Sequence, residues 1–444
     1  MKSSLLVLGA GRSSAALIDY LIRQSESRNW SLTVGDLSLA SAQERVQKSK
    51  TATAIAFDIQ NESASAAAIA RADVVISLLP ATLHPKVAQL CLAHHKHLLT
   101  ASYVSAEMRA MDHAARQQGL LFLNECGLDP GIDHMSAMQV MDRIRSEGGR
   151  ITSFESFTGG LIAPDTDPGN PWRYKFTWNP RNVVMAGQGT ARFLQDGTHK
   201  YIPYQQLFQR TTPIHVSGHG RFDGYANRDS LQYIDTYGLQ GIQTILRGTL
   251  RHEGYCSAWN VFAQLGCCDD TYPMARVDQM THRDFIAAFC GLKPDETPEQ
   301  YLTEHFQLTP EGPELSKLRW SGLFSEEPIG LAAGTPAAVL EHILNKRWKL
   351  EPHDKDFIVM WHRFRYTLAG HTHTIEASLA TTGEDSTHTA MSRTVGLPLA
   401  MAATLLMQDQ IALRGVHIPV SSEIYEPILS MLADEGIRLT EKAY

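Results

Sequence analysis

The chain has 444 residues, of which 43% are hydrophobic and 20% charged, and its formal net charge is −7. This length exceeds what one ordinary hydrophobic core accommodates, so we expect a globular protein of two or three domains. A net negative chain lacks the basic field that attracts nucleic-acid phosphates or anionic membranes, and we predict neither as a partner. The six cysteines form no Cys-x-x-Cys pair, a pattern typical of reduced thiols and a cytoplasmic location.

The first third of the chain alternates short apolar runs with segments of helical character. The runs expected to be strands are 5–8, 32–35, 54–57, 73–78, 97–101 and 120–124. Between the first two, Leu17 and Leu21 fall four residues apart and share one helix face. This alternation predicts an α/β fold with a doubly wound parallel sheet of the Rossmann type.

The turn after the first strand has the glycine pattern of a dinucleotide-binding loop. Gly9 suits the tight turn, Gly11 the close approach of backbone amides to a diphosphate, and Ser14 stands where a third glycine is usual. The helix N-terminus that follows would attract the diphosphate. The cofactor-binding residues predicted here are Gly9, Ala10, Gly11, Arg12 and Ser13. The same pattern also fits a bare strand-to-helix turn.

Other strand ends extend the predicted cofactor site. Asp36 ends the second strand, where a carboxylate would bind the ribose hydroxyls and repel a 2′-phosphate. We therefore predict NAD as the cofactor, with NADP possible, although Asp36 also suits a solvated turn or helix cap. Ser77 and Leu78 follow the fourth strand, and Ala101 and Ser102 the fifth, where ligands of such sheets bind.

The pattern changes after residue 124. Residues 125–144 predict a turn followed by a long helix. Residues 152–157 and 357–382 predict antiparallel strands, with a turn at Ala369-Gly370 in the second range. Residues 283–323 predict helices. The apolar stretch 397–407 is about half the ~20 residues that cross a bilayer, so we expect a core helix. Because no low-complexity linker separates these parts, the second domain is expected to be inserted into the first or packed tightly on it.

Several segments resemble the glutamate-forming saccharopine dehydrogenases, also called saccharopine reductases. The matching segments include "GLDPGIDHMSAM" (127–138), "NPWRYKFTWNP" (170–180), "YANRDS" (225–230), "LRGTLRHEGY" (246–255) and "TVGLPLAMAA" (394–403). The resemblance implies a Rossmann domain of residues 1–125 completed by 391–444, with an α+β substrate and dimerisation domain at 126–390. It also implies oxidation of saccharopine by NAD(P) and water to glutamate and 2-aminoadipate 6-semialdehyde through an imine, by a homodimer.

The resemblance also assigns roles within this sequence. Tyr103 and Asp129 would be catalytic, beside the reacting nitrogen and able to move protons. The predicted substrate-binding residues are Ser102, Tyr103, Asp129, Arg228, Thr249 and Arg251. The arginines suit a substrate with several carboxylates, with Arg173 and Lys175 as further cations. Thr158 replaces a family cysteine, so no role of that thiol is carried over.

Several alternatives stay open at this point. The chain could be a related imine reductase for a polyamine or other amino-acid conjugate such as carboxynorspermidine, or a cofactor-binding scaffold without catalysis. Each arginine could form a surface salt bridge, Asp129 a turn, and Tyr103 a core contact. The nineteen histidines show no metal-ligand spacing, and we predict no metal; His134 could support the active site. The physiological direction and the effect of Thr158 are undecided by the sequence.

Overall fold

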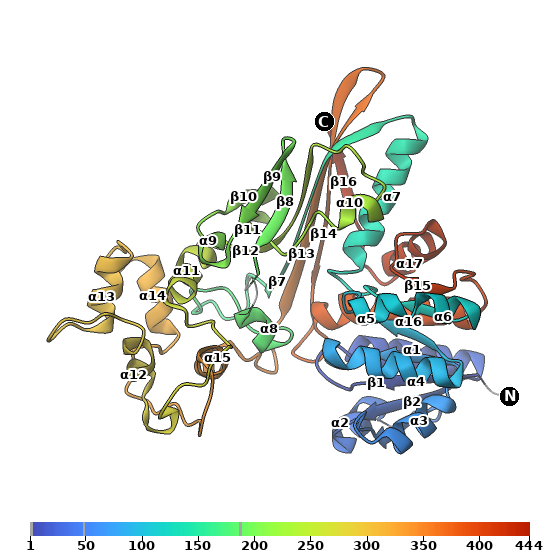
Figure 1. Cartoon of the computed structure of the whole chain (residues 1–444), viewed down its shortest axis with the longest axis horizontal. Coiled ribbons are helices and arrows are strands. Elements are labelled where there is room, and N and C mark those ends of the chain that lie inside the picture. Colours follow the sequence, from blue (N-terminus) through green and yellow to red (C-terminus); the bar gives the residue numbers. More distant parts are fainter. Residues whose placement is uncertain (1–2, 48, 186–188) are drawn as a thin grey trace. The chain divides into compact units, whose positions relative to one another are not determined.

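The computed structural model describes residues 3–47, 49–185 and 189–444 (Figure 1). They form two compact units, which are described separately. The first unit comprises Met1–Gly148 and Gly383–Leu439, and the second comprises Gly149–Thr382 and Thr440–Tyr444. The predicted boundaries at 125/126 and 390/391 therefore differ from the observed ones. The long helix after residue 131 belongs to the first unit, because it packs against a C-terminal helix of that unit.

The first unit is built on a seven-stranded parallel sheet with strand order β15-β6-β5-β4-β1-β2-β3. Its strands are β1 Ser4–Leu8, β2 Ser31–Asp36, β3 Ala52–Ala56, β4 Val74–Ser77, β5 His97–Thr100, β6 Leu121–Leu123 and β15 Gly415–His417. The six predicted strands and the Rossmann-type sheet are confirmed. The seventh strand was not predicted; it comes from the C-terminal segment and extends the sheet beside β6.

Helices cover both faces of this sheet. They are α1 Ala15–Arg28, α2 Leu39–Val46, α3 Glu62–Ala70, α4 His84–His94, α5 Ala106–Ala110, α6 Asp112–Gln117, α7 Ile132–Ser146, α16 Ala390–Met407 and α17 Ser422–Asp434, with a short 3₁₀ turn at Ala81–Leu83. Leu6 and Leu8 belong to one apolar cluster with side chains of α3, α4, α5 and α6. Because side chains alternate along a strand, Leu5 and Val7 face the other side, and both are buried.

Helix α16 packs directly behind the glycine turn. A side chain at Gly396 would lie 2.9 Å from the Leu17 Cβ and 3.2 Å from the Ser13 carbonyl oxygen, so glycine permits the close approach of α16 to α1. Among the described helices, α16 is long and apolar enough to cross a membrane, yet 83% of it is buried inside the protein. Its packing agrees with the predicted core helix.

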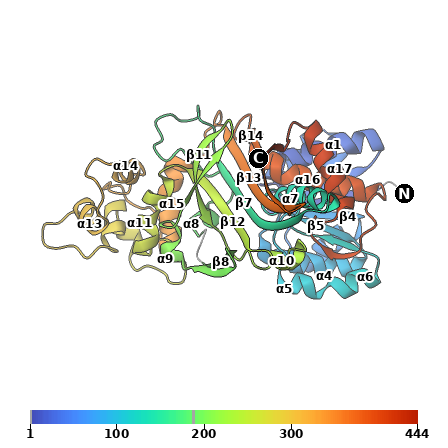
Figure 2. The same ribbon diagram turned by 90° about the horizontal axis from the view of Figure 1, so that it is seen from above.

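The second unit is built on a nine-stranded mixed sheet (Figure 2). Its main order is β10-β11-β12-β7-β13-β14-β16, and β8 and β9 form a hairpin beside β12. The strands are β7 Arg150–Ile162, β8 Ala191–Gln195, β9 Thr198–Ile202, β10 Thr212–Val216, β11 Gly220–Ala226, β12 Thr244–His252, β13 Asp356–Leu368, β14 His371–Thr382 and β16 Thr440–Ala443. The predicted strands at 152–157 and 357–382 are confirmed, with the turn at Ala369-Gly370. Among the described strands of this sheet, β12 and β7 are the one pair that runs parallel.

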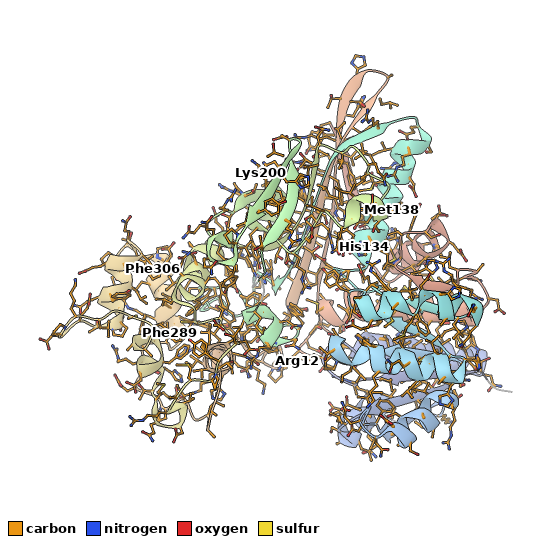
Figure 3. The ribbon with its side chains drawn as sticks, in the orientation of Figure 1. Arg12, His134, Met138, Lys200, Phe289 and Phe306 are labelled. Atoms are coloured by element: carbon orange, nitrogen blue, oxygen red, sulfur yellow. The ribbon has the colours of Figure 1, made fainter. Side chains whose placement is uncertain are left out.

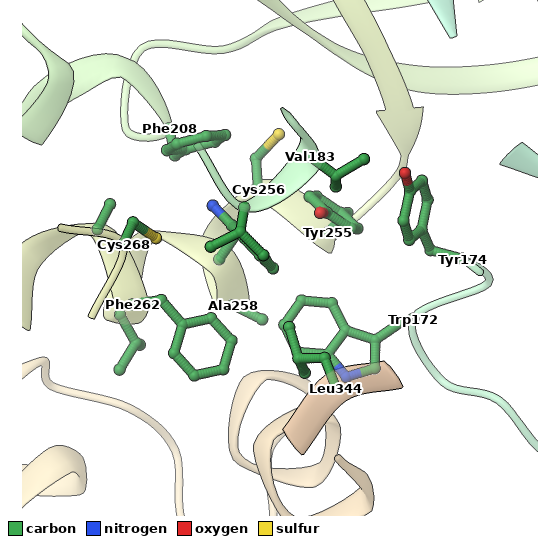
Figure 4. Packing of buried hydrophobic residues seen from close by; sticks show 14 of the residues in the cluster. Trp172, Tyr174, Val183, Phe208, Tyr255, Cys256, Ala258, Phe262, Cys268 and Leu344 are labelled. Carbon is green, nitrogen blue, oxygen red and sulfur yellow. The ribbon is translucent and has the colours of Figure 1, made fainter. Parts of the chain in front are cut away.

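The helices of the second unit enclose a large aromatic core (Figure 4). They are α8 Pro180–Val184, α9 Tyr204–Leu207, α10 Tyr233–Thr236, α11 Tyr255–Leu265, α12 His282–Ala287, α13 Pro298–His305, α14 Pro313–Trp320 and α15 Pro336–Trp348, with a 3₁₀ turn at Val277–Gln279. The helical region predicted at 283–323 corresponds to α12, α13 and α14. At the centre of the core, the Trp172 ring lies 5.4 Å from Tyr255 and 5.2 Å from Trp348.

Candidate active site

The glycine turn of the first unit has the geometry of a phosphate-binding loop. The Gly9 amide donates to the Gly35 carbonyl at 2.8 Å, and its φ of +106° is one that glycine adopts without strain. Ser14 turns inward and donates to the Gly11 carbonyl at 2.7 Å, so its side chain does not cap the α1 N-terminus. A side chain at Gly11 would meet nothing within 4 Å, and Arg12 is exposed (Figure 3). This loop offers backbone amides and open space to an anionic group.

Asp36 is fixed beside this loop by two backbone amides. Its Oδ2 accepts from the Ala10 amide at 2.8 Å, and its Oδ1 accepts from the Ser38 amide at 2.9 Å. The sequence placed Asp36 at this strand end but gave no sign of either bond. Arg45 of α2 also reaches the loop, with Nε 3.5 Å from the Ala10 carbonyl oxygen. The Asp36 carboxylate and the Arg45 guanidinium therefore both lie beside this loop.

The ends of β4 and β5 lie beside each other in the sheet. Ser77 is buried, and Leu78 donates from its amide to the Leu8 carbonyl at 2.8 Å. Ala101 packs under the next loop, because a side chain at Gly127 would lie 2.9 Å from the Ala101 Cβ. The predicted cofactor residues of the first unit thus gather at the carboxyl edge of one sheet, as the topology requires.

The two predicted catalytic residues are hydrogen-bonded to each other. The Tyr103 hydroxyl donates to Asp129 Oδ1 across 3.4 Å, and both side chains are half-buried. Glu125 holds the Tyr103 segment: its Oε1 accepts from the Val104 amide at 3.0 Å, and its amide donates to the Ser102 carbonyl. A tyrosine and a carboxylate in contact can position and transfer a proton.

Buried ionisable side chains contact the segments that carry Tyr103 and Asp129. His134 of α7 lies with Nε2 2.9 Å from Glu125 Oε2, and both side chains are buried (Figure 3). Asp133 accepts from the Gly131 amide at 2.6 Å and so fixes the start of α7. His134 thus contacts a residue that orients Tyr103, as a supporting residue would.

Gly131 is required by the shape of the loop that carries Asp129. Its φ is +148°, and a side chain there would overlap the backbone of Gly127. We expect Gly131→Ala to lower the free energy of unfolding by about 3 kcal/mol or more, since neither backbone can move without breaking the turn. Thermal unfolding of the variant measures this. Gly169→Ala is the control, because its added methyl group meets nothing within 4 Å and should leave the melting temperature nearly unchanged.

The second unit contains a buried guanidinium on the same sheet face as two threonines. Thr249 and Arg251 lie two residues apart on β12, and Thr158 pairs with Thr249 across β7, so all three share a face. Arg251 is 4% exposed and lies 5.1 Å above the Tyr174 ring and 5.3 Å from the Tyr255 ring. Its Nη1 donates to the Leu250 carbonyl, while its Nε has no hydrogen-bond partner among the described residues.

The aromatic groups around Arg251 supply no anion, and Asp223, its cross-strand neighbour on β11, accepts from the Gly254 amide instead of forming an ion pair with Arg251. Burial raises the pKa of Tyr225 and raises that of Tyr255 well above the usual value, so both phenols are neutral at neutral pH. Across the described chain, no carboxylate forms an ion pair with Arg251. A buried cation without a counter-ion is costly, and an anionic ligand would relieve that cost. Arg251 therefore has the properties of a carboxylate-binding residue.

The other predicted cations have different environments. Arg228 is exposed with a φ of +54°, and Arg173 is also exposed. The Lys175 ammonium lies 3.1 Å from Asp167 and 2.7 Å from Asp354. In the ligand-free chain Lys175 is thus paired with two carboxylates, and its role as a further substrate-binding cation stays a prediction.

Comparison with known proteins gives the family of the chain. Residues 5–123 match the saccharopine dehydrogenase NADP binding domain, and residues 127–437 match the saccharopine dehydrogenase C-terminal domain. The chain belongs to the saccharopine dehydrogenase family. The first unit thus contains the nicotinamide-cofactor-binding domain of a saccharopine dehydrogenase.

Relatives and a solved structure support the assignment over the whole chain. The chain is 32% identical to the saccharopine dehydrogenase [NADP(+), L-glutamate-forming] of Saccharomyces cerevisiae, covering 100% of this chain and 99% of that one. It is 34% identical to the rat mitochondrial alpha-aminoadipic semialdehyde synthase, covering 98% of this chain and 47% of that protein. The chain therefore spans about half the length of the mammalian relatives. The apo yeast saccharopine dehydrogenase (L-Glu forming) superposes with a TM-score of 0.88, at 31% identity and full coverage of both chains.

Sequence reasoning did not single out several polar residues that lie beside the predicted site residues. Glu125 lies two residues after the end of β6, at the ligand edge, and that position could have identified it. Asn227 donates to Thr249 Oγ1 at 3.2 Å, and Arg247 is buried with its guanidinium 4.3 Å from the Tyr233 ring. Arg247 is two residues before Thr249 and therefore shares the polar face, a spacing visible in "LRGTLR".

The structure divides the predicted site residues between the two units. Tyr103 and Asp129 are together in the first unit with the cofactor-binding residues. Thr249 and Arg251 share a sheet face in the second unit, whereas Arg228 lies at its surface. Thr158 is buried on the face of Arg251, and its hydroxyl has no hydrogen-bond partner in the described part of the chain.

Proposed function

We propose that the protein oxidises saccharopine with a nicotinamide cofactor and water to glutamate and 2-aminoadipate 6-semialdehyde. Beyond the family assignment, one observation carries this proposal: the buried Arg251 guanidinium has an unpartnered Nε and no acidic partner among the described side chains. A scaffold without a substrate has no need of such a costly charge, whereas a substrate with several carboxylates supplies its counter-ion.

Tyr103 and Asp129 would handle the protons of the reaction. A nicotinamide cofactor held by the first unit would supply the hydride acceptor for the carbon next to the secondary amine. The amine nitrogen must first lose its proton, and water must then add to the resulting imine. Asp129 would accept the proton, and the Tyr103 hydroxyl, which donates to Asp129, would orient that carboxylate. After passing that proton on to solvent, the Asp129 carboxylate would also stabilise the cationic imine.

We infer NAD as the preferred cofactor, because the Asp36 carboxylate stands where a ribose would bind and would repel a 2′-phosphate. Asp36→Ala should weaken NAD binding about tenfold and reduce the discrimination against NADP, for which Arg45 offers a nearby cation. Dissociation constants for both oxidised cofactors measure this, with Asp58→Ala, an exposed carboxylate after β3, as the control. Unchanged constants in Asp36→Ala would remove this residue from the ribose site.

The activity is tested by following NADH formation by purified protein supplied with NAD and saccharopine. Carboxynorspermidine serves as the competing substrate, which a related imine reductase would prefer. Reduction of cofactor with saccharopine alone supports the proposal, and preference for the polyamine conjugate contradicts it. Absence of NADH with both substrates, at intact cofactor binding, would instead indicate a cofactor-binding scaffold.

We further propose a homodimer and a cytoplasmic location. The dimer rests on the family resemblance, and sedimentation of the purified chain tests it. The location rests on the cysteine pattern, in which Cys91, Cys126, Cys256, Cys267 and Cys268 are buried free thiols. The mammalian relatives carry the word mitochondrial in their names, so localisation of a tagged chain is the direct test.

A further inference from the structure

A buried histidine joins the carboxyl ends of β4 and β5. His84 begins α4, and 4% of it is exposed. Its Nδ1 lies 3.0 Å from Ser77 Oγ at the end of β4. Its Nε2 lies 2.8 Å from Ser102 Oγ and 3.0 Å from Thr100 Oγ1, at the end of β5. One imidazole ring therefore contacts hydroxyls of both strand ends.

The charge state of His84 makes the two contacts dependent on each other. Burial lowers the pKa of His84 to about 4, so the ring is uncharged at neutral pH. An uncharged imidazole has one N–H donor and one acceptor nitrogen, whereas each hydroxyl can donate or accept. The ring must donate toward one strand end and accept from the other. The direction of the hydrogen bond at Ser77 therefore sets the direction at Ser102.

The position of these hydroxyls links the ring to the ligand edge. Ser77 and Ser102 are predicted to contact the cofactor, and Ser102 directly precedes Tyr103, whose hydroxyl donates to Asp129. The Ser102 amide donates to Thr100 Oγ1 at 3.3 Å, so the same network also holds the backbone before Tyr103. A substitution of His84 would therefore disturb both Ser77, a predicted cofactor contact, and the backbone before Tyr103.

His97 provides a contrast within the same sheet. It begins β5 at the opposite, amino edge, and its Nδ1 accepts one backbone hydrogen bond, from Leu121 at 2.9 Å. Burial lowers the pKa of His97 to about 4 as well. His97 is thus an uncharged histidine of the same sheet whose described hydrogen bond touches no hydroxyl of the ligand edge.

We propose that His84 is a positioning residue that couples cofactor binding at Ser77 to the orientation of Ser102 and Tyr103. The cofactor half of this proposal requires only the dinucleotide-binding domain. The substrate half rests on the proposed function, in which Tyr103 and Asp129 act on saccharopine.

Two substitutions test the cofactor half and the substrate half of the proposal separately. Each retains a polar group near one of the two ring nitrogens of His84. In His84→Asn the amide lies near the Nδ1 position and keeps the Ser77 contact but loses Thr100 and Ser102. In His84→Gln the amide lies near the Nε2 position and keeps the β5 contacts but loses Ser77. We expect His84→Asn to lower kcat about tenfold and to weaken cofactor binding less, because Ser102 is also a predicted cofactor contact, and His84→Gln to weaken cofactor binding about tenfold with a smaller change in kcat.

The measurements are cofactor titrations by NADH fluorescence and steady-state kinetics with saccharopine, on the full chain. His97→Asn is the matched control. We expect it to change stability without changing kcat and cofactor affinity to different extents. Thr100→Val removes the other β5 hydroxyl from His84 Nε2 at a residue outside the predicted binding sets; it should lower kcat in the same direction as His84→Asn, which keeps the proposal testable if one histidine variant fails to fold. If both His84 variants shift kcat and cofactor affinity in the same proportion, or only lower the melting temperature as His97→Asn does, His84 is a packing residue and the proposal is wrong.

The outcome is distinguishable from failure of the proposed function. A wild-type chain that binds NADH but does not oxidise saccharopine contradicts the proposed function. The fluorescence titration of His84→Gln still tests the link to Ser77 in that case. Unaltered NADH affinity in a folded His84→Gln variant overturns the cofactor half directly.

Discussion

Replacing Arg251 with glutamine should remove substrate binding while leaving the fold intact. The variant keeps a polar side chain of similar length but has no charge to pair with a carboxylate. We expect kcat/KM for saccharopine to fall about 100-fold or more, which corresponds to about 3 kcal/mol of lost transition-state stabilisation. NADH affinity should not change, because the cofactor-binding residues belong to the other unit. Steady-state kinetics and fluorescence titration measure the two effects.

Thermal unfolding gives the sharper test of this assignment. Arg251 is buried without an ion pair among the described residues, so in the ligand-free protein the Leu250 carbonyl and the Tyr174 and Tyr255 rings offset only part of the cost of its charge. The melting temperature of Arg251→Gln should therefore equal or exceed that of the wild type, although activity is lost. A structural arginine would show the opposite, a lower melting temperature at unchanged KM. Arg221→Gln, an exposed arginine on β11 with a 3.7 Å contact to Glu253, is the control and should alter neither quantity.

Arg251→Lys separates charge from geometry. Lysine keeps the positive charge but lacks the planar fork that binds a carboxylate with two hydrogen bonds. We expect an activity between those of the wild type and Arg251→Gln. Activity of the lysine variant equal to the wild type would show that only the charge is needed.

Asp129→Asn should abolish most of the chemistry without disturbing binding. Asparagine has nearly the same shape and can still accept the hydrogen bond from Tyr103, but it can neither take a proton nor balance a cationic imine. Loss of a general base typically costs about 10²- to 10⁴-fold, and we expect kcat to fall within this range. KM for saccharopine and the NADH dissociation constant should stay within about threefold.

Two further variants help to interpret the result for Asp129→Asn. Tyr103→Phe removes the hydroxyl that orients Asp129 and should lower kcat less, about tenfold. Asp58→Asn, an exposed carboxylate of the same unit, should have no effect. A fall in kcat confined to Tyr103→Phe, with Asp129→Asn fully active, would assign proton transfer to the tyrosine and leave Asp129 as a turn residue.

The sequence predicted the first sheet well, because its strands are apolar on both faces and therefore form continuous hydrophobic runs. It missed β15 because this strand is three residues long, and only pairing with β6, nearly 300 residues earlier in the chain, makes it a strand. In the second unit, the long alternating strands β7, β13 and β14 were recognised. The short strands from β8 to β11 carry too few residues to show a period.

Site residues that belong to local motifs could be predicted, whereas residues whose partners are far away in the sequence could not. Tyr103 and Asp129 were identified through the resemblance, and the structure places them in contact. The proposed role of His84 depends on Ser102, eighteen residues away in the loop after β5, and no spacing in the sequence marks it. The ion pair of Lys175 with Asp354 was not predictable for the same reason, since 179 residues separate the two.

The course of the chain between its two units has a practical consequence for dissecting the protein. The polypeptide passes from one unit to the other after residues 148, 382 and 439, so a single cut at any position leaves at least one sheet without one of its strands. An isolated nucleotide-binding fragment must be made by joining residue 148 to residue 383 through a designed connector, rather than by truncation. Shortening the C-terminus by five residues would remove β16 and open the edge of β14 to intermolecular strand pairing and precipitation.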